Sequence, residues 1–396
     1  MVLLGPAFVA AIAYVDPGNV AANITAGSRY GFALVWVLVL ASAMSVVVQY
    51  QSAKLGLATG RSLPRLMGER LHSRPARIGY WLQAEIVAAA TDLAEVIGGA
   101  LALHLLFDLP LVVGGVIVAA VSLALLAIQT RRRQRTFEFV IMGLLLVITI
   151  GFVAGLVIDP PAPSAVAGGL FPQFPETGAV LVAASMLGAT VMPHAIYLHS
   201  SLVVDRHGSP DPGLRSRYLR AIRLDVALAL AVAGAVNISL LLVAAQSLRG
   251  TAGTDTIEGA HAAISTAFGP VVAVVFAIGL LASGLASTSV GAYAGSEIMA
   301  GLLHRRVPLL ARRLVTVAPA LLVLGLGVEP TAALVISQVV LSFGIPFVLV
   351  PLVWLTSRSS VMGAFRDSVP LRVVSLVVIG LVVALNLGLV FLTLAP

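Results

Sequence analysis

The chain of 396 residues is 59% hydrophobic and only 10% charged, and its mean hydropathy is +1.04. A soluble protein has about a quarter of its residues charged, because water must solvate its surface. This composition therefore excludes an ordinary soluble enzyme and predicts that a lipid bilayer surrounds most of the chain. The absence of cysteine excludes disulfides, thiolate metal sites and cysteine nucleophiles.

Apolar stretches of the length that a helix needs to cross a bilayer recur along the whole chain. They are continuous rather than alternating, which favours helices over the strands of a membrane barrel. We therefore predict an all-α polytopic membrane protein with eleven transmembrane helices. The predicted spans are 4–29, 31–55, 78–107, 109–129, 137–157, 178–203, 218–247, 270–303, 309–327, 330–356 and 371–394.

The 24 basic residues and the net charge of +7 are explained by where these residues lie. All of them except Arg29 and Arg249 fall in the even-numbered connections between the spans. Because basic connections stay in the cytoplasm, this pattern predicts a protein of the cell membrane with a cytoplasmic N-terminus and an extracytoplasmic C-terminus. The basic charge thus reflects topology, and we expect no nucleic-acid partner.

The first span is interrupted by the polar run Asp16-Pro17-Gly18-Asn19. A carboxylate at this depth costs about 3 kcal/mol or more and is tolerated where it faces a cavity, an ion or a partner. Pro17 has no N–H, so the carbonyl of Ala13 loses its helical partner and is free to bind something else. Asn19 follows Asp16 by three residues, so both side-chain oxygens can converge beside this carbonyl.

The sixth span carries a second interruption, Met192-Pro193-His194, in which Pro193 frees the carbonyl of Ala189 in the same way. The two interrupted helices begin two successive groups of five spans. Because five is odd, the second group enters the membrane from the opposite side, as in an inverted-topology repeat. We therefore predict a first repeat over 1–157, a second over 158–357 and an eleventh helix over 358–396.

Five groups then converge on one point: the side chains of Asp16, Asn19 and Met192 and the carbonyls of Ala13 and Ala189. Oxygen ligands alone would suit Na⁺, Mg²⁺ or Ca²⁺ about equally. A thioether favours softer first-row metals, among them manganese and iron. Methionine more often fills gaps in a core, but its place beside one interruption and opposite the other favours a ligand.

These two motifs resemble those of the Nramp family of proton-coupled divalent-metal transporters, which carries Asp-Pro-Gly-Asn in its first helix and Met-Pro-His in its sixth. The resemblance extends over essentially the whole chain. It implies a LeuT-type fold with a five-plus-five inverted repeat, in which helices 1 and 6 are broken at mid-membrane. It also implies that the same five groups bind the metal, and that Gln338 of the tenth span approaches the ion.

The third span carries three acids, Glu85, Asp92 and Glu95, at steps that keep them on one helix face. Such a stripe is able to pass protons through the membrane. Arg312 and Arg313, at the start of the ninth span, are able to neutralise it. The resemblance implies that acids and arginines in these positions form a proton pathway. The alternative is a static ion-pair network that fixes two helices together.

His194 is interpreted either as a metal ligand or as a proton-relay and packing residue. Histidine ligands would favour zinc and copper, so we place His194 on the proton pathway, together with Asp16. The other six histidines lie at span ends or in connections, where we expect them to be solvated.

The sequence thus predicts a secondary transporter, functional as a monomer, that imports Mn²⁺ and Fe²⁺ with protons by alternating access. The metal and the protons are substrates, and no resident cofactor is expected. The alternative is a Na⁺-coupled carrier of amino acids or other organic solutes on the same fold. An intramembrane enzyme is not expected, because the chain contains neither His-Glu-x-x-His nor Gly-x-Ser-x-Gly.

Overall fold

The structure is a computed structural model that describes residues 5–128, 159–208, 213–251, 253–305 and 307–394, with five isolated residues between 143 and 156. Every regular element within these ranges is a helix, as the sequence predicts. Seven helical stretches are long and apolar enough to cross a membrane. The fifth predicted span, 137–157, falls outside the described residues apart from those five positions, so the count of eleven stays a prediction.

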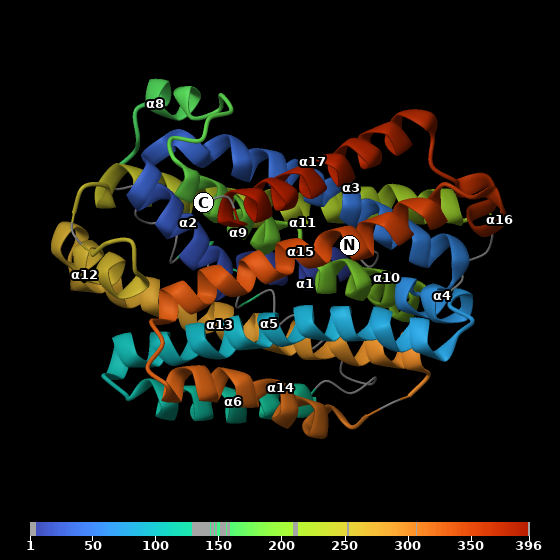
Figure 1. Cartoon of the computed structure of the whole chain (residues 1–396), viewed down its shortest axis with the longest axis horizontal. Coiled ribbons are helices and arrows are strands. Elements are labelled where there is room, and N and C mark those ends of the chain that lie inside the picture. The colour runs from blue at the N-terminus through green and yellow to red at the C-terminus, as the bar shows by residue number, and fades with distance from the viewer. Residues whose placement is uncertain are drawn as a thin grey trace.

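The helices are arranged as an elongated bundle in which chain-distant elements lie side by side (Figure 1). Their bounds are α1 Pro6–Ile12, α2 Pro17–Tyr30, α3 Val35–Thr59, α4 Leu63–Arg70, α5 Arg74–Phe107, α6 Leu111–Ile128, α8 Pro163–Gly168, α9 Thr177–Thr190, α10 Pro193–His207, α11 Arg215–Val243, α12 Ile257–Phe268, α13 Pro270–Leu303, α14 Leu309–Gly325, α15 Pro330–Thr356, α16 Ser359–Met362 and α17 Val369–Leu394. Short turns link several of them: η1 Ala13–Val15, η2 Gly31–Leu34, η3 Ala244–Leu248 and η4 Gly363–Phe365.

Both predicted interruptions are present. The first span consists of α1, the turn η1 and α2, and the sixth consists of α9 and α10. Each second half begins with a proline, Pro17 or Pro193, at a position where a helix does not need the missing N–H. Asp16 caps α2 by accepting a hydrogen bond from the backbone N–H of Asn19 at 2.7 Å. The sequence therefore restarts both helices at the residues where the prolines stand.

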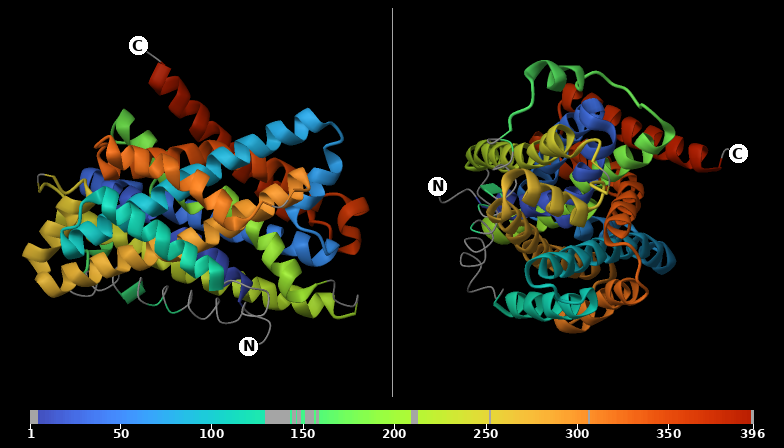
Figure 2. Two further views of the ribbon diagram at one scale, coloured as in Figure 1. Left: turned by 90° about the horizontal axis from the view of Figure 1, so that it is seen from below. Right: turned by 90° about the vertical axis from the view of Figure 1, so that its left-hand side faces the viewer.

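The two interrupted spans cross each other in opposite directions. The first half of one, α1, packs against the second half of the other, α10, while α2 packs against α9. An inverted repeat requires this antiparallel relationship. The repeat boundaries at 157 and 357 stay predictions. Helix α17 lies at the edge of the bundle, and its C-terminal end projects away from it (Figure 2).

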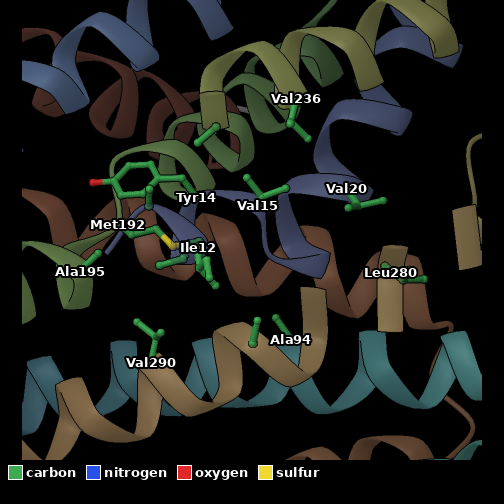
Figure 3. Packing of buried hydrophobic residues seen from close by; sticks show 14 of the residues in the cluster. Ile12, Tyr14, Val15, Val20, Ala94, Met192, Ala195, Val236, Leu280 and Val290 are labelled. Carbon is green, nitrogen blue, oxygen red and sulfur yellow. The ribbon is translucent and has the colours of Figure 1, made fainter. Parts of the chain in front are cut away.

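The largest apolar cluster surrounds the interruption of the first span (Figure 3). Ile12, Tyr14 and Val15 meet Met192 from the sixth span and Val290 from α13 there. Dense packing around the break fixes the position of backbone that makes no regular helical hydrogen bonds. The interruptions therefore lie within the densely packed core.

Candidate metal site

The side chains of Asp16 and Asn19 meet at the start of α2. Asp16 Oδ1 accepts hydrogen bonds from the backbone N of Asn19 at 2.7 Å and from its Nδ2 at 2.8 Å. Asp16 Oδ2 and the single side-chain oxygen of Asn19, Oδ1, are buried and have no hydrogen-bond partner among the described residues. Unpaired acceptor oxygens are costly inside a protein, and a cation is the ligand that satisfies them.

The sixth span supplies the opposite wall of this site. The carbonyl oxygen of Ala189 accepts a hydrogen bond from Asn19 Nδ2 at 2.8 Å, so the carbonyl that Pro193 frees is engaged by the other interrupted span. Met192 is fully buried at the start of α10. Its sulfur points towards Ile12 at the end of α1, next to Ala13 in the chain (Figure 3). The structure thus brings the interrupted ends of both spans together.

Gln338 of α15 lies against both interruptions. A Cβ placed on Gly18 would stand 1.9 Å from Gln338 Nε2, and a Cβ on Gly188 would stand 1.9 Å from the Gln338 carbonyl oxygen. Glycine is therefore required for this close approach. Gln338 Nε2 donates to Ser337 Oγ at 3.2 Å, while its Oε1 is buried without a hydrogen-bond partner. Gln338 thus adds a third unpaired acceptor oxygen beside the first interruption.

The predicted acids and arginines form two ion pairs between α5 and α14. Arg312 Nη2 lies 2.7 Å from Glu85 Oε1, and Arg313 Nη1 lies 2.8 Å from Asp92 Oδ1. The side chains of Arg313 and Asp92 are 1% and 2% exposed, whereas that of Glu85 is 19% exposed. The acid stripe therefore runs from a fully buried pair to one that is partly exposed at the surface of the bundle.

Glu95 lies at the buried end of this stripe. Both of its carboxylate oxygens are buried without a hydrogen-bond partner. A Cβ on Gly291 of α13 would stand 3.0 Å from Glu95 Oε1 and 3.5 Å from Asp92 Oδ1. Thr91 directly precedes Asp92 in the chain, and its hydroxyl shares a hydrogen bond with His194 Nδ1 at 3.2 Å. The sixth-span interruption and the acid stripe are therefore neighbours.

The expectation that the remaining histidines are solvated is wrong for His199. It is 1% exposed, and its Nδ1 shares a hydrogen bond with Gln49 Oε1 at 2.7 Å. Gln49 Nε2 in turn donates to the hydroxyl of Tyr14 at 2.5 Å. Gln49 is an amide in an apolar span, and such residues usually face partners within the bundle. That signal was available in the sequence and would have identified this network.

Asn237 of α11 supports the first interruption from another side. Its Nδ2 donates to the carbonyl oxygen of Tyr14 at 2.6 Å, and its Oδ1 accepts from Asn23 Nδ2 at 3.0 Å. Ser283 donates to the carbonyl of Val15 at 2.5 Å. Side chains from neighbouring helices therefore satisfy carbonyls that the broken helix leaves without partners.

Known proteins resemble this chain over almost its full length. The profile of the family described as "Natural resistance-associated macrophage protein-like" matches residues 7–392. The divalent metal cation transporter MntH of Mycobacterium tuberculosis is 60% identical over 392 residues, which cover 99% of this chain and 91% of that protein.

Solved structures agree with this result. A manganese transporter of Eremococcus coleocola, crystallised with an aromatic bis-isothiourea compound, superposes with a TM-score of 0.86 at 30% identity, covering 98% of this chain and 86% of that one. MhsT in complex with L-phenylalanine superposes with a TM-score of 0.63 at 15% identity, over 98% of this chain and 97% of that one. The second likeness shows the fold alone, and it agrees with the predicted LeuT-type arrangement. The chain is a multi-pass membrane protein that belongs to the Nramp family.

Proposed function

We propose that this chain imports divalent transition-metal ions, Mn²⁺ and Fe²⁺, together with protons across the cell membrane. The observation that carries the proposal is the set of three buried acceptor oxygens, on Asp16, Asn19 and Gln338, that have no hydrogen-bond partner among the described residues, together with the buried Met192 at the start of α10. A carboxylate, amide oxygens and a thioether suit a first-row metal better than an alkali or alkaline-earth ion. The metal is a substrate in this proposal, and the transporter acts as a monomer.

The hydrogen bond between Asn19 and Ala189 suggests how the site opens and closes. Asp16, Asn19, Ala189 and Met192 are all completely buried, so the site is closed to solvent. In the metal-loaded state the carbonyls of Ala13 and Ala189 turn to the ion, and Ala189 exchanges the N–H of Asn19 for the cation. Rocking of the two interrupted spans against α5 and α13 then exposes the site to either side in turn.

Protons take a separate route in this proposal. Asp16 and His194 lie at the two interruptions, and His194 reaches α5 through Thr91. Glu95, Asp92 and Glu85 continue from there along α5 towards the solvent, with the two arginines of α14 stabilising the ionised acids. The buried oxygens of Glu95 support this assignment, because acids inside the bundle of a membrane protein commonly form proton relays.

A Na⁺-coupled carrier of organic solutes is not favoured. The relative at 60% identity is named as a divalent metal cation transporter, whereas the likeness to MhsT at 15% identity bears on the fold only. A carboxylate and a thioether also occupy the place where an organic solute would need room.

Uptake of Mn²⁺ into proteoliposomes tests the proposal. Asp16→Asn should abolish uptake, because the site loses its only anionic ligand, and Fe²⁺ should compete with Mn²⁺ in the unaltered protein. Asp108→Asn makes the same chemical change at a side chain that is 98% exposed and should leave uptake unchanged. A pH-sensitive dye inside the vesicles should report acidification that accompanies Mn²⁺ entry. Uptake by the Asp16→Asn variant equal to that of the unaltered protein would contradict the assignment of Asp16 to the metal. Entry of Mn²⁺ without acidification of the vesicles would contradict proton coupling.

A further inference from the structure

Two arginines contact one tryptophan at the end of α15. The guanidinium carbon of Arg358 lies 4.1 Å from the centre of the Trp354 ring, and that of Arg70 lies 5.3 Å from it. Arg70 ends α4, and Arg358 directly precedes α16. Neither has a carboxylate within 4.0 Å in the part of the chain that the structure describes. In contrast, the nearby Glu69 lies 2.8 Å from Arg61 and 3.4 Å from Arg65.

An exposed apolar face of α15 leads along that helix to this pair of charges. On α15 the exposed side chains recur at steps of three and four residues, which places them on one helix face that ends at Trp354. Helix α5 packs beside α15, and the hydroxyl of its Tyr80 donates to the carbonyl of Phe347 at 2.6 Å. The two helices lie next to each other in Figure 1, with α4 and α16 at the same end. The face of α15 that ends at Trp354 carries the exposed side chains of Phe343, Phe347 and Val350.

We propose that Arg70 and Arg358, which contact the ring of Trp354, bind the phosphate of an anionic glycerophospholipid, whose acyl chains lie along the exposed face of α15. No carboxylate in the described part of the chain offsets these two positive charges beside one ring, and the planar guanidinium matches the oxygens of a phosphate. Tryptophan is the side chain that prefers the boundary between headgroups and hydrocarbon. The basic connections on this side are predicted to face the cytoplasm, where anionic headgroups attract them.

The apolar surface distinguishes a lipid from free phosphate. A phosphate ion would use the arginines alone, whereas a phospholipid also covers the aromatic and aliphatic side chains that lead to them. Charge complementarity and the exposed apolar face of α15 therefore point to the same occupant. This inference is independent of the transported metal, because none of its residues belongs to the metal site or to the proton route.

Native mass spectrometry of the purified, delipidated protein tests the inference, with phosphatidylglycerol titrated against phosphatidylcholine. Arg70→Gln with Arg358→Gln should weaken phosphatidylglycerol binding about thirtyfold, since each basic residue near a membrane surface contributes about fivefold. Trp354→Leu keeps both charges and should weaken binding about fivefold. The matched control, Arg217→Gln with Arg220→Gln, removes the same charge from exposed positions of α11 and should bind as the unaltered protein does.

Three results would overturn the inference. The first is equal binding of phosphatidylglycerol by the Arg70 and Arg358 double variant and by the unaltered protein. The second is equal binding of phosphatidylcholine and phosphatidylglycerol by the unaltered protein, which would indicate unselective lipid contact. The third is displacement of the bound lipid by inorganic phosphate at equal concentration, which would assign the arginines to the free ion. If the double variant does not fold, Trp354→Leu replaces it, and equal binding of phosphatidylglycerol by this variant and by the unaltered protein would overturn the inference.

Discussion

The carbonyl oxygen of Gln338 lies so close to Gly188 that a Cβ there would approach it to 1.9 Å. Helix α15 therefore packs backbone against backbone on the end of α9, immediately before the second interruption. Gly18 faces the same glutamine, but there the nearest atom is the side-chain Nε2. The two glycines thus differ in what a methyl group would displace, because a side chain rotates away whereas a backbone carbonyl held in a helix does not.

This difference predicts separate effects for two alanine substitutions. Gly188→Ala should lower the free energy of unfolding by about 3 kcal/mol. Gly18→Ala should cost about 1 kcal/mol and act mainly on transport, by moving Gln338. Thermal unfolding in detergent measures both. Gly79→Ala is the control, because Gly79 lies in α5 with nothing within 4 Å, and alanine there should stabilise the helix slightly. A Gly188→Ala variant as stable as this control would contradict the packing argument.

Asn19→Ala should weaken Mn²⁺ binding about thirtyfold. The substitution removes an oxygen that faces the site and the hydrogen bond that orients the Asp16 carboxylate, and such contacts contribute about 2 kcal/mol. Isothermal titration with Mn²⁺ measures the change. Ser45→Ala is the control, because Ser45 donates to the carbonyl of Thr190 at 2.6 Å and so supports the same interruption without offering a ligand. If both variants bind equally well, Asn19 is a structural residue only.

Met192→Leu should weaken the discrimination between Mn²⁺ and Ca²⁺. Leucine keeps the volume of the buried side chain and removes only the sulfur, so competition by Ca²⁺ should strengthen about tenfold while Mn²⁺ transport continues. Inhibition of Mn²⁺ uptake by increasing Ca²⁺ measures this. Met186→Leu makes the same change at another buried methionine, within α9, and should have no effect. Unchanged discrimination in the Met192→Leu variant would show that the sulfur is packing.

The sequence was sufficient to predict features that follow from local chemistry. Pro17 and Pro193 determine where the two spans break, and the spacing of Glu85, Asp92 and Glu95 determines their common face. The sequence was not sufficient to predict contacts between helices. The apolar faces of the helices have similar compositions, so they do not indicate which helix packs against which. The hydrogen bond from Asn19 to Ala189 is such a contact.

His199 illustrates the same limit for a single residue. Its position near a span end predicted solvent, whereas the packing of α10 against α3 buries it beside Gln49. In an apolar sequence, a position near a predicted span end does not indicate whether a neighbouring helix buries the residue.

The ion pair between Arg313 and Asp92 provides the test that separates a proton route from a static link. Arg313→Gln alone should destabilise the protein by about 3 kcal/mol, because it leaves a buried carboxylate without its counter-charge. Combining it with Asp92→Asn removes both charges and should restore most of that stability.

The same double variant separates the two roles in transport. Proton coupling predicts that an acidic external solution stimulates Mn²⁺ uptake. If the pair only joins α5 to α14, this double variant should keep that acid stimulation. We expect instead that acid stimulation is lost while Mn²⁺ binding remains, because the stripe loses an acid that exchanges protons. Lys54→Gln with Asp367→Asn is the control, because it neutralises another buried ion pair, between α3 and the segment before α17, and should leave acid stimulation intact.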